Sequence, residues 1–267
     1  MDKTPEEPGS AEHGPLKSFL EHLEDLRWVL VKILTVVSIA WTACFYLGPQ
    51  ILLFLQQPLK WSGVKDPSKF LRVFSPAEAF SISFQLALYA GLIISAPLVI
   101  YFIASFVLPA LTKREKRYIA PAFWLGSIFF LAGVFFCYFL VLPPALRVSI
   151  QFANWLHIDV EFWTVDSYVS FVTKFMLGMG IAAELPLVIL ALVTFGILDY
   201  AKLSKVRRHV IVLNFILGAV LTTPEPLTMF LMAIPLTIMY EACIWIAWFI
   251  ERRRKREQGT GDGGQQA

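Results

Sequence analysis

The sequence predicts an all-α membrane protein with six transmembrane helices and both termini in the cytoplasm. An N-terminal amphipathic surface helix precedes the first span, and the last two spans are short. Of the 267 residues, 57% are hydrophobic and only 16% are charged, whereas soluble domains keep about a quarter of their residues charged. Residues 79–112 and 118–146 carry no charge at all. Each run exceeds the roughly 20 apolar residues that cross a bilayer.

The polar ends of the chain set the domain limits. Residues 1–15 are polar and lack the basic start and short apolar core of a cleavable signal peptide. We therefore expect a disordered cytoplasmic tail over 1–15, a six-span membrane domain over 16–250, and a basic and then disordered cytoplasmic tail over 251–267. The three cysteines lie in apolar runs, which favours buried or lipid-facing thiols over disulfides or metal ligands.

Hydrophobic periodicity places the first four spans. Residues 16–27 put leucine and phenylalanine at helical spacing with charges between them, which predicts a helix on the membrane surface running into a first span at about 28–47. A loop of about 30 residues follows and contains a short apolar piece, 51–55. The next three spans are expected at about 79–107 with a kink at Pro97, at 121–142 ended by Pro143 and Pro144, and at 167–198 with Lys174 and Glu184 inside it.

The apolar stretch 210–250 could hold two short spans, one span plus a re-entrant piece, or a deep hairpin that never fully crosses. Positive charge constrains the choice, because cytoplasmic loops carry the Lys and Arg excess. Residues 202–208 contain 4 basic side chains and residues 252–256 contain 5. The two segments should share a side, so the number of crossings between them is even. We favour two spans that meet at a tight turn over 223–226.

Glu184 is the unusual side chain within the spans. A carboxylate at bilayer depth costs about 2.5–3.5 kcal/mol on insertion scales. It could be a neutral, hydrogen-bonded acid that joins helices, or a polar spot on a concave face where a substrate or another helix docks; we favour docking. Lys174 is ten residues away, about 15 Å along one helix, so the two cannot pair directly.

The remaining charged segments have ordinary explanations from composition alone. The basic loop 112–117, with Glu115 in its middle, is a positive-inside anchor. Glu241 is expected near the cytoplasmic interface, within reach of the basic run 252–256. The GMG sequence at 178–180 favours close helix packing over phosphate binding. No spacing resembles a metal site or an active site, so we expect no cofactor, no metal and no enzyme activity.

The order of motifs, however, resembles the TatC family. The motifs that carry the resemblance run from about residue 16 to 250: His22-Leu23-Glu24-Asp25-Leu26-Arg27; Ser75-Pro76-Ala77-Glu78-Ala79-Phe80; Phe106-Val107-Leu108-Pro109-Ala110-Leu111, followed by Lys113, Arg114, Glu115 and Arg117; Gly133, Phe136, Tyr138 and Pro143; Glu184-Leu185-Pro186; Leu221-Thr222-Thr223-Pro224; and Ala233-Ile234-Pro235. Each motif is weak alone, whereas the ordered set is specific.

This resemblance implies the core receptor subunit of the twin-arginine translocase, located in the bacterial inner membrane. Such a protein binds twin-arginine signal peptides of folded precursors. With single-span subunits of the TatA and TatB type, it drives export powered by the proton-motive force. The resemblance also implies a homo-oligomer within the complex, contact with membrane lipid, and no nucleic-acid partner.

The resemblance assigns residues to three groups. Signal-peptide binding carries over to Glu115, Phe106, Asp25, Glu24 and Arg27. An intramembrane polar or partner site carries over to Glu184 and Pro186. Structural motif positions carry over to Pro76, Glu78, Pro97, Pro109, Tyr138, Pro143, Pro224 and Pro235.

The chain departs from the family pattern at two places. Asp25 is one methylene shorter than the usual glutamate, and Glu225 and Pro226 reverse the usual order of proline and acid. The alternative from another functional class is a proton-coupled secondary transporter of a small molecule. It would explain Glu184 and Lys174, but it usually shows repeated halves, and these are absent from the sequence.

Overall fold

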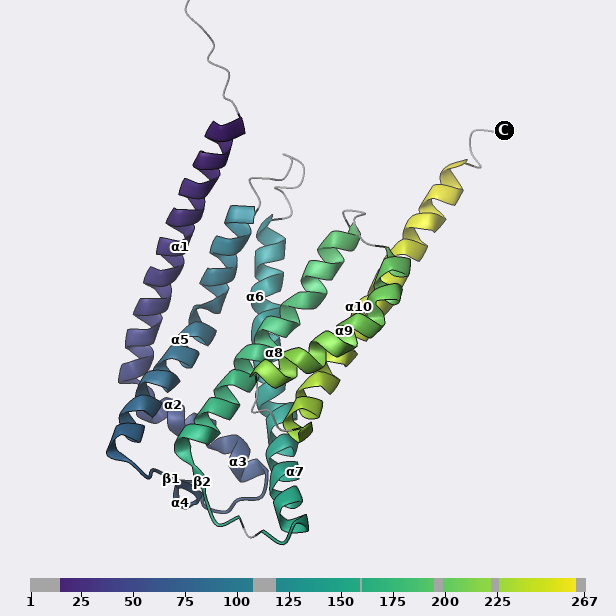
Figure 1. The fold of residues 1–267 in the computed structure, drawn as a ribbon. Coiled ribbons are helices and arrows are strands. Elements are labelled where there is room, and N and C mark those ends of the chain that lie inside the picture. Colours follow the sequence, from purple (N-terminus) through teal and green to yellow (C-terminus); the bar gives the residue numbers. More distant parts are fainter. Residues whose placement is uncertain (1–14, 108–118, 159, 195–198, 222–225, 263–267) are drawn as a thin grey trace, which may run out of the picture.

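A computed structural model describes residues 15–107, 119–158, 160–194, 199–221 and 226–262 (Figure 1). Its helices are α1 (Pro15–Tyr46), α2 (Gly48–Leu55), α3 (Gln57–Trp61), α4 (Pro67–Phe70), α5 (Pro76–Val107), α6 (Ile119–Phe136), a π-helical turn (Cys137–Val141), α7 (Leu142–Trp155), α8 (Val165–Thr194), α9 (Tyr200–Leu221) and α10 (Pro226–Asp262). Two short strands, β1 (Leu71–Arg72) and β2 (Trp163–Thr164), pair in parallel. The described chain is thus nearly all helical, as predicted; the strand pair was not predicted.

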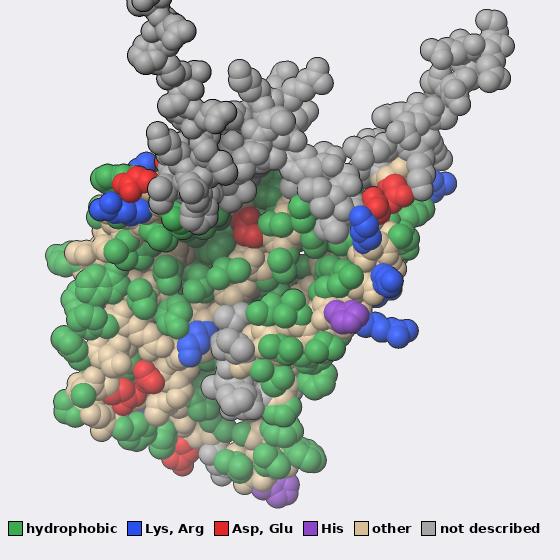
Figure 2. Space-filling model, turned by 45° about the horizontal axis from the view of Figure 1, so that its top comes forward, with side chains coloured by type: hydrophobic (Ala, Val, Ile, Leu, Met, Phe, Trp, Pro, Cys, Tyr) green, Lys and Arg blue, Asp and Glu red, His purple; other side chains and the backbone are tan. Residues whose placement is uncertain are grey.

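Five helical segments of the described residues are long and apolar enough to cross a membrane. They are Leu23–Tyr46, Pro76–Phe106, Trp124–Trp155, Val165–Ile189 and Met229–Phe249. Hydrophobic side chains dominate the face in Figure 2, and charged side chains lie along its upper edge and right flank, with a few lower on the face. These observations support the prediction of a multi-pass membrane protein.

Helix α9 is not among these five segments. Its first turns carry Lys202, Lys205, Arg207 and Arg208, and only the remainder is apolar. The sixth crossing therefore remains a prediction. Helix α10, in contrast, contains a candidate span of 21 residues, which is ordinary in length. The prediction that both C-terminal spans are short is wrong for α10.

The N-terminal segment and the first span form one uninterrupted helix. Residues 16–27 continue directly into the apolar part of α1. A separate helix lying along the membrane surface therefore stays a prediction.

The third span does not end at Pro143 and Pro144, as the sequence analysis expected. Helical structure continues through the π-helical turn into α7. The N–H of Leu142 bonds to the carbonyl of Cys137, five residues earlier. The two prolines then fall in the first turn of α7, where a missing N–H and a φ near −65° are tolerated.

Two buried tyrosines fix the segment after α1 onto the bundle. The Tyr138 hydroxyl donates to the carbonyl of Phe54 at 2.7 Å, and the Tyr168 hydroxyl donates to that of Leu55 at 2.6 Å. The ring of Phe54 also stacks on Tyr138, with ring centroids 4.4 Å apart. Tyr138, predicted as a structural motif residue, therefore anchors α2 to the end of α6.

Helix α8 runs through the middle of the bundle and packs on α5, α6 and α10 (Figure 1). Its closest neighbour is α6. A Cβ at Gly133 would lie 2.5 Å from Cβ of Ala183, and one at Gly180 would lie 2.8 Å from a methyl group of Val134. Only glycine allows this approach. The prediction that residues 178–180 serve close packing is confirmed at Gly180.

Candidate receptor surface and intramembrane site

Helices α1 and α5 bring predicted binding residues to one end of the molecule. The two helices run antiparallel, and a Cβ at Gly91 would lie 2.9 Å from the backbone nitrogen of Trp41. Asp25 precedes Trp41 by 16 residues and Phe106 follows Gly91 by 15, so both lie about 23 Å along the helices from this contact. Figure 1 shows these helix ends at the top, beside the start of α6.

The charged side chains near the start of α1 are solvent-exposed. Arg27 Nη1 lies 3.4 Å from Glu24 Oε1, and both side chains are more than half exposed, so the pair adds little stability. Asp25 makes no ion pair with any residue that the structure describes. Its carboxylate is therefore open to a cationic ligand. Glu115 and Pro109 lie outside the described residues.

Glu78 has a structural role at the start of α5. The backbone N–H of Phe74 donates to Glu78 Oε2 at 2.8 Å. Ser75 precedes the first helical residue, Pro76, and the acid stands three positions after the serine. The arrangement resembles a capping box, in which a side chain satisfies a free N–H group at the helix start.

Glu184 lies in the seam between α6 and α8. Its Oε2 would be 3.1 Å from a Cβ at Gly126, beside side chains of Ile100 and Leu187. Its Oε1 and the hydroxyl of Ser127 are both buried without a hydrogen-bond partner. Two unsatisfied polar atoms therefore lie in an apolar seam, where each costs free energy unless a guest or water satisfies it.

Pro186 is buried in α8, one turn or less from Glu184. Because proline has no N–H, the carbonyl of Ala182 loses its usual helical donor. Lys174 is half-buried in the same helix, and within the described chain no ion pair joins it to Glu184, consistent with the predicted separation.

Glu241 forms an ion pair with α9; a contact with the basic run 252–256 stays a prediction, because the side chains of 253–256 lie outside the described residues. Its Oε2 lies 3.0 Å from Nη2 of Arg207 on α9. The Tyr240 hydroxyl donates to the carbonyl of Leu203 at 2.9 Å, which fastens the same two helices. Sequence reasoning missed this pairing because the two charges are 34 positions apart and share no helix.

Three of the predicted structural prolines lie at the start or in the interior of described helices. Pro76 begins α5, Pro97 lies inside α5 and Pro235 inside α10. Pro224 and Glu225 lie outside the described residues. In the described part of the chain, no three His, Cys, Asp or Glu side chains gather as metal ligands would.

Comparison with known proteins decides the family. The model of the Sec-independent protein translocase protein (TatC) family matches residues 21–235. The chain belongs to the TatC family.

Individual TatC proteins are similar over most of the chain. A TatC of Aquifex aeolicus is 34% identical over 239 residues, which are 89% of this chain and 98% of that protein. A TatC of Akkermansia muciniphila is 41% identical over 194 residues, 71% of this chain; the match spans only 56% of that longer protein. A crystal structure of the twin-arginine translocase receptor TatC superimposes with a TM-score of 0.76 at 33% identity, covering 85% of this chain and 98% of the other.

These similarities place the chain among membrane-bound components of a protein translocase. They identify a transport receptor family rather than a family of enzymes. They do not favour the alternative of a small-molecule transporter.

Proposed function

We propose that this chain is the receptor subunit that binds twin-arginine signal peptides of folded precursors. The observation that carries the proposal is the shared level of Asp25 on α1 and Phe106 on α5, which follows from their equal distances from the contact of Gly91 with Trp41. Glu115 follows α5 in the sequence. With single-span subunits of the TatA and TatB type, the chain drives export powered by the proton-motive force.

Carboxylates at this level suit an arginine pair. A guanidinium is planar and binds a carboxylate through two parallel hydrogen bonds, whereas lysine is a point charge. Lys113, Arg114, Lys116 and Arg117 surround Glu115 in sequence. They repel a peptide that is merely basic, so bidentate geometry rather than total charge selects the ligand.

The intramembrane site is assigned to the apolar part of the signal peptide or to a single-span partner. Glu184 offers a buried oxygen without a hydrogen-bond partner. A polar side chain on an incoming helix would satisfy this atom. The surrounding helix faces are apolar, which suits an apolar peptide segment.

The orientation follows from charge. The end of the molecule that holds the start of α1, the start of α9 and the end of α10 carries the basic clusters (Figure 1). We assign this end to the cytoplasm of a bacterium and the membrane to its inner membrane. Six crossings then place both termini on that side.

Photo-crosslinking to a twin-arginine precursor tests the receptor role. The probe stands at position 106, in membranes that contain the TatA- and TatB-type partners. Glu115→Ala is expected to reduce the crosslink at least tenfold, because the guanidinium pair loses its bidentate acceptor. Membrane insertion should remain intact, since position 115 lies in the charged segment 113–117 between two long uncharged runs.

Glu161→Ala is the matched control, because it removes an exposed acid on the other side of the bundle, next to β2. It should leave the crosslink unchanged. Undiminished crosslinking in Glu115→Ala would remove Glu115 from recognition. Equal loss in both variants would show that total charge, not this carboxylate, matters.

A further inference from the structure

Helix α9 carries a row of side chains that the receptor function does not use. Lys205, Arg208, His209, Val212, Leu213 and Ile216 recur at spacings of three and four residues, so they share one face of the helix. The three apolar members are each at least 50% exposed. The face therefore has a basic end and an apolar end, and it points away from the rest of the helix bundle.

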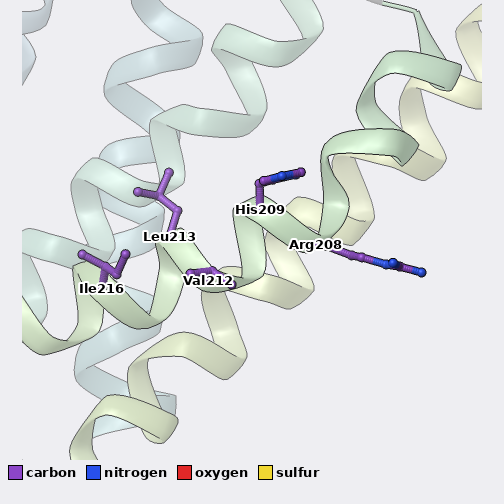
Figure 3. Close-up of a pocket in the computed structure, with 5 residues that line it drawn as sticks. All are labelled: Arg208, His209, Val212, Leu213 and Ile216. Atoms are coloured by element: carbon purple, nitrogen blue, oxygen red, sulfur yellow. The ribbon is translucent and has the colours of Figure 1, made fainter.

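The last five of these residues along the chain line an open groove. Arg208, His209, Val212, Leu213 and Ile216 lie along one side of this shallow groove, whose volume is about 430 Å³. Figure 3 shows Arg208 and His209 at one end of the groove and Leu213 and Ile216 at the other. The groove therefore has basic groups at one end and apolar side chains at the other.

The ion pair beside the groove shows how deep these basic groups lie. Arg207, the neighbour of Arg208, pairs with Glu241 at 3.0 Å. Glu241 lies inside the apolar span Met229–Phe249, eight residues from its end, which is about 12 Å along α10. Arg208 and His209 therefore lie well below the level at which the apolar surface of α10 ends.

The neighbouring residues Arg207 and Arg208 differ in whether a carboxylate neutralises their charge. Glu241 provides the counter-charge of Arg207, whereas no described carboxylate lies within ion-pair distance of Arg208. A lipid-facing cation at this depth is costly unless an anion accompanies it. An anionic phospholipid fits this face, because its headgroup supplies the anion and its acyl chains match the apolar side chains.

We propose that the α9 groove binds one anionic phospholipid, with its phosphate on Arg208 and His209 and an acyl chain along Val212, Leu213 and Ile216. Basic pockets on the cytoplasmic side of membrane proteins hold phospholipid headgroups in this way. The bound headgroup lies deeper than its neighbours in the same leaflet. The bilayer is therefore thinner beside the short apolar part of α9.

Native mass spectrometry of the full chain, released from nanodiscs of equal parts phosphatidylcholine and phosphatidylglycerol, tests the site. The wild type is expected to retain phosphatidylglycerol in preference to phosphatidylcholine. Arg208→Gln should reduce the retained phosphatidylglycerol about fivefold, the change that corresponds to about 1 kcal/mol for one basic residue. Arg208→Gln with His209→Gln should reduce it further.

Two further variants distinguish lipid binding in the α9 groove from a general attraction of anionic lipid to positive charge. Lys32→Gln removes an exposed charge from α1, outside the groove, and should leave retention unchanged. Leu213→Trp keeps every charge but fills the groove, and should also reduce retention. The proposal is overturned if Arg208→Gln retains as much phosphatidylglycerol as the wild type, as when a partner helix covers this face. Equal loss in Lys32→Gln, or full retention in Leu213→Trp, overturns it as well.

Discussion

At the scale of single residues, Glu184 costs stability at the position that we propose as a docking site. One of its oxygens is buried without a hydrogen-bond partner in the seam of α6 and α8. An unsatisfied buried group costs about 1–3 kcal/mol. A chain selected for stability alone would place leucine here, so the acid supports the proposed binding role.

Glu184→Leu should therefore separate stability from function. The variant removes the unsatisfied oxygen and keeps a similar volume, so its thermal midpoint in detergent should equal or exceed that of the wild type. Export of a twin-arginine precursor should fall strongly, because the polar contact is lost. A midpoint several degrees lower together with normal export would contradict the assignment.

Residues of the site could be predicted from the sequence only where their type differs from that of the surrounding residues. Glu184 was found because it is an acid within an apolar run. The buried Ser127 was missed, because a serine in a span carries no distinctive signal. The pairing of Glu241 with Arg207 was also missed, since nothing local distinguishes Arg207 of α9 from the basic run 252–256 as a partner.

At the scale of elements, the seam of α6 and α8 determines where Glu184 lies. The two helices approach each other at Gly133 and Gly180, where a Cβ would collide with the facing helix. This contact holds Glu184 against Gly126 one to two turns away. The position of the acid therefore depends on small residues elsewhere in the seam.

Gly133→Ala should destabilise the protein. Its Cβ would lie 2.5 Å from Cβ of Ala183 and 2.8 Å from the carbonyl oxygen of Met179, so the helices must separate, at a cost of about 1–3 kcal/mol. Gly48→Ala is the control, because nothing lies within 4 Å of its Cβ. Unfolding in a denaturing detergent series measures both. The account fails at this point if the two variants unfold alike.

Element boundaries were predictable where composition changes sharply. The span of α5 follows from its uncharged run, although the helix begins at Pro76, three residues before the expected start. The end of the third span was mistaken because proline normally stops a helix. The π-helical turn places Pro143 in the first turn of a new helix instead, and this depends on packing that a single sequence does not reveal.

At the scale of the whole molecule, α9 and α10 form a hairpin of unequal apolar length. The uncharged end of α9, residues 210–221, spans 12 residues, about 18 Å, while α10 has a candidate span of 21 residues. The hairpin is fastened by Arg207 with Glu241 and by Tyr240 with Leu203. A short helix beside a longer one favours local thinning of the bilayer.

The central claim is that this member of the TatC family distinguishes an arginine pair in a signal peptide from a lysine pair of equal charge. The direct measurement is the affinity of the purified chain in nanodiscs for a twin-arginine signal peptide and for its twin-lysine counterpart. The wild type should bind the arginine peptide at least tenfold more tightly, and Glu115→Gln should lose most of that preference. Equal affinity for both peptides in the wild type, or an unchanged preference in Glu115→Gln, would contradict the account.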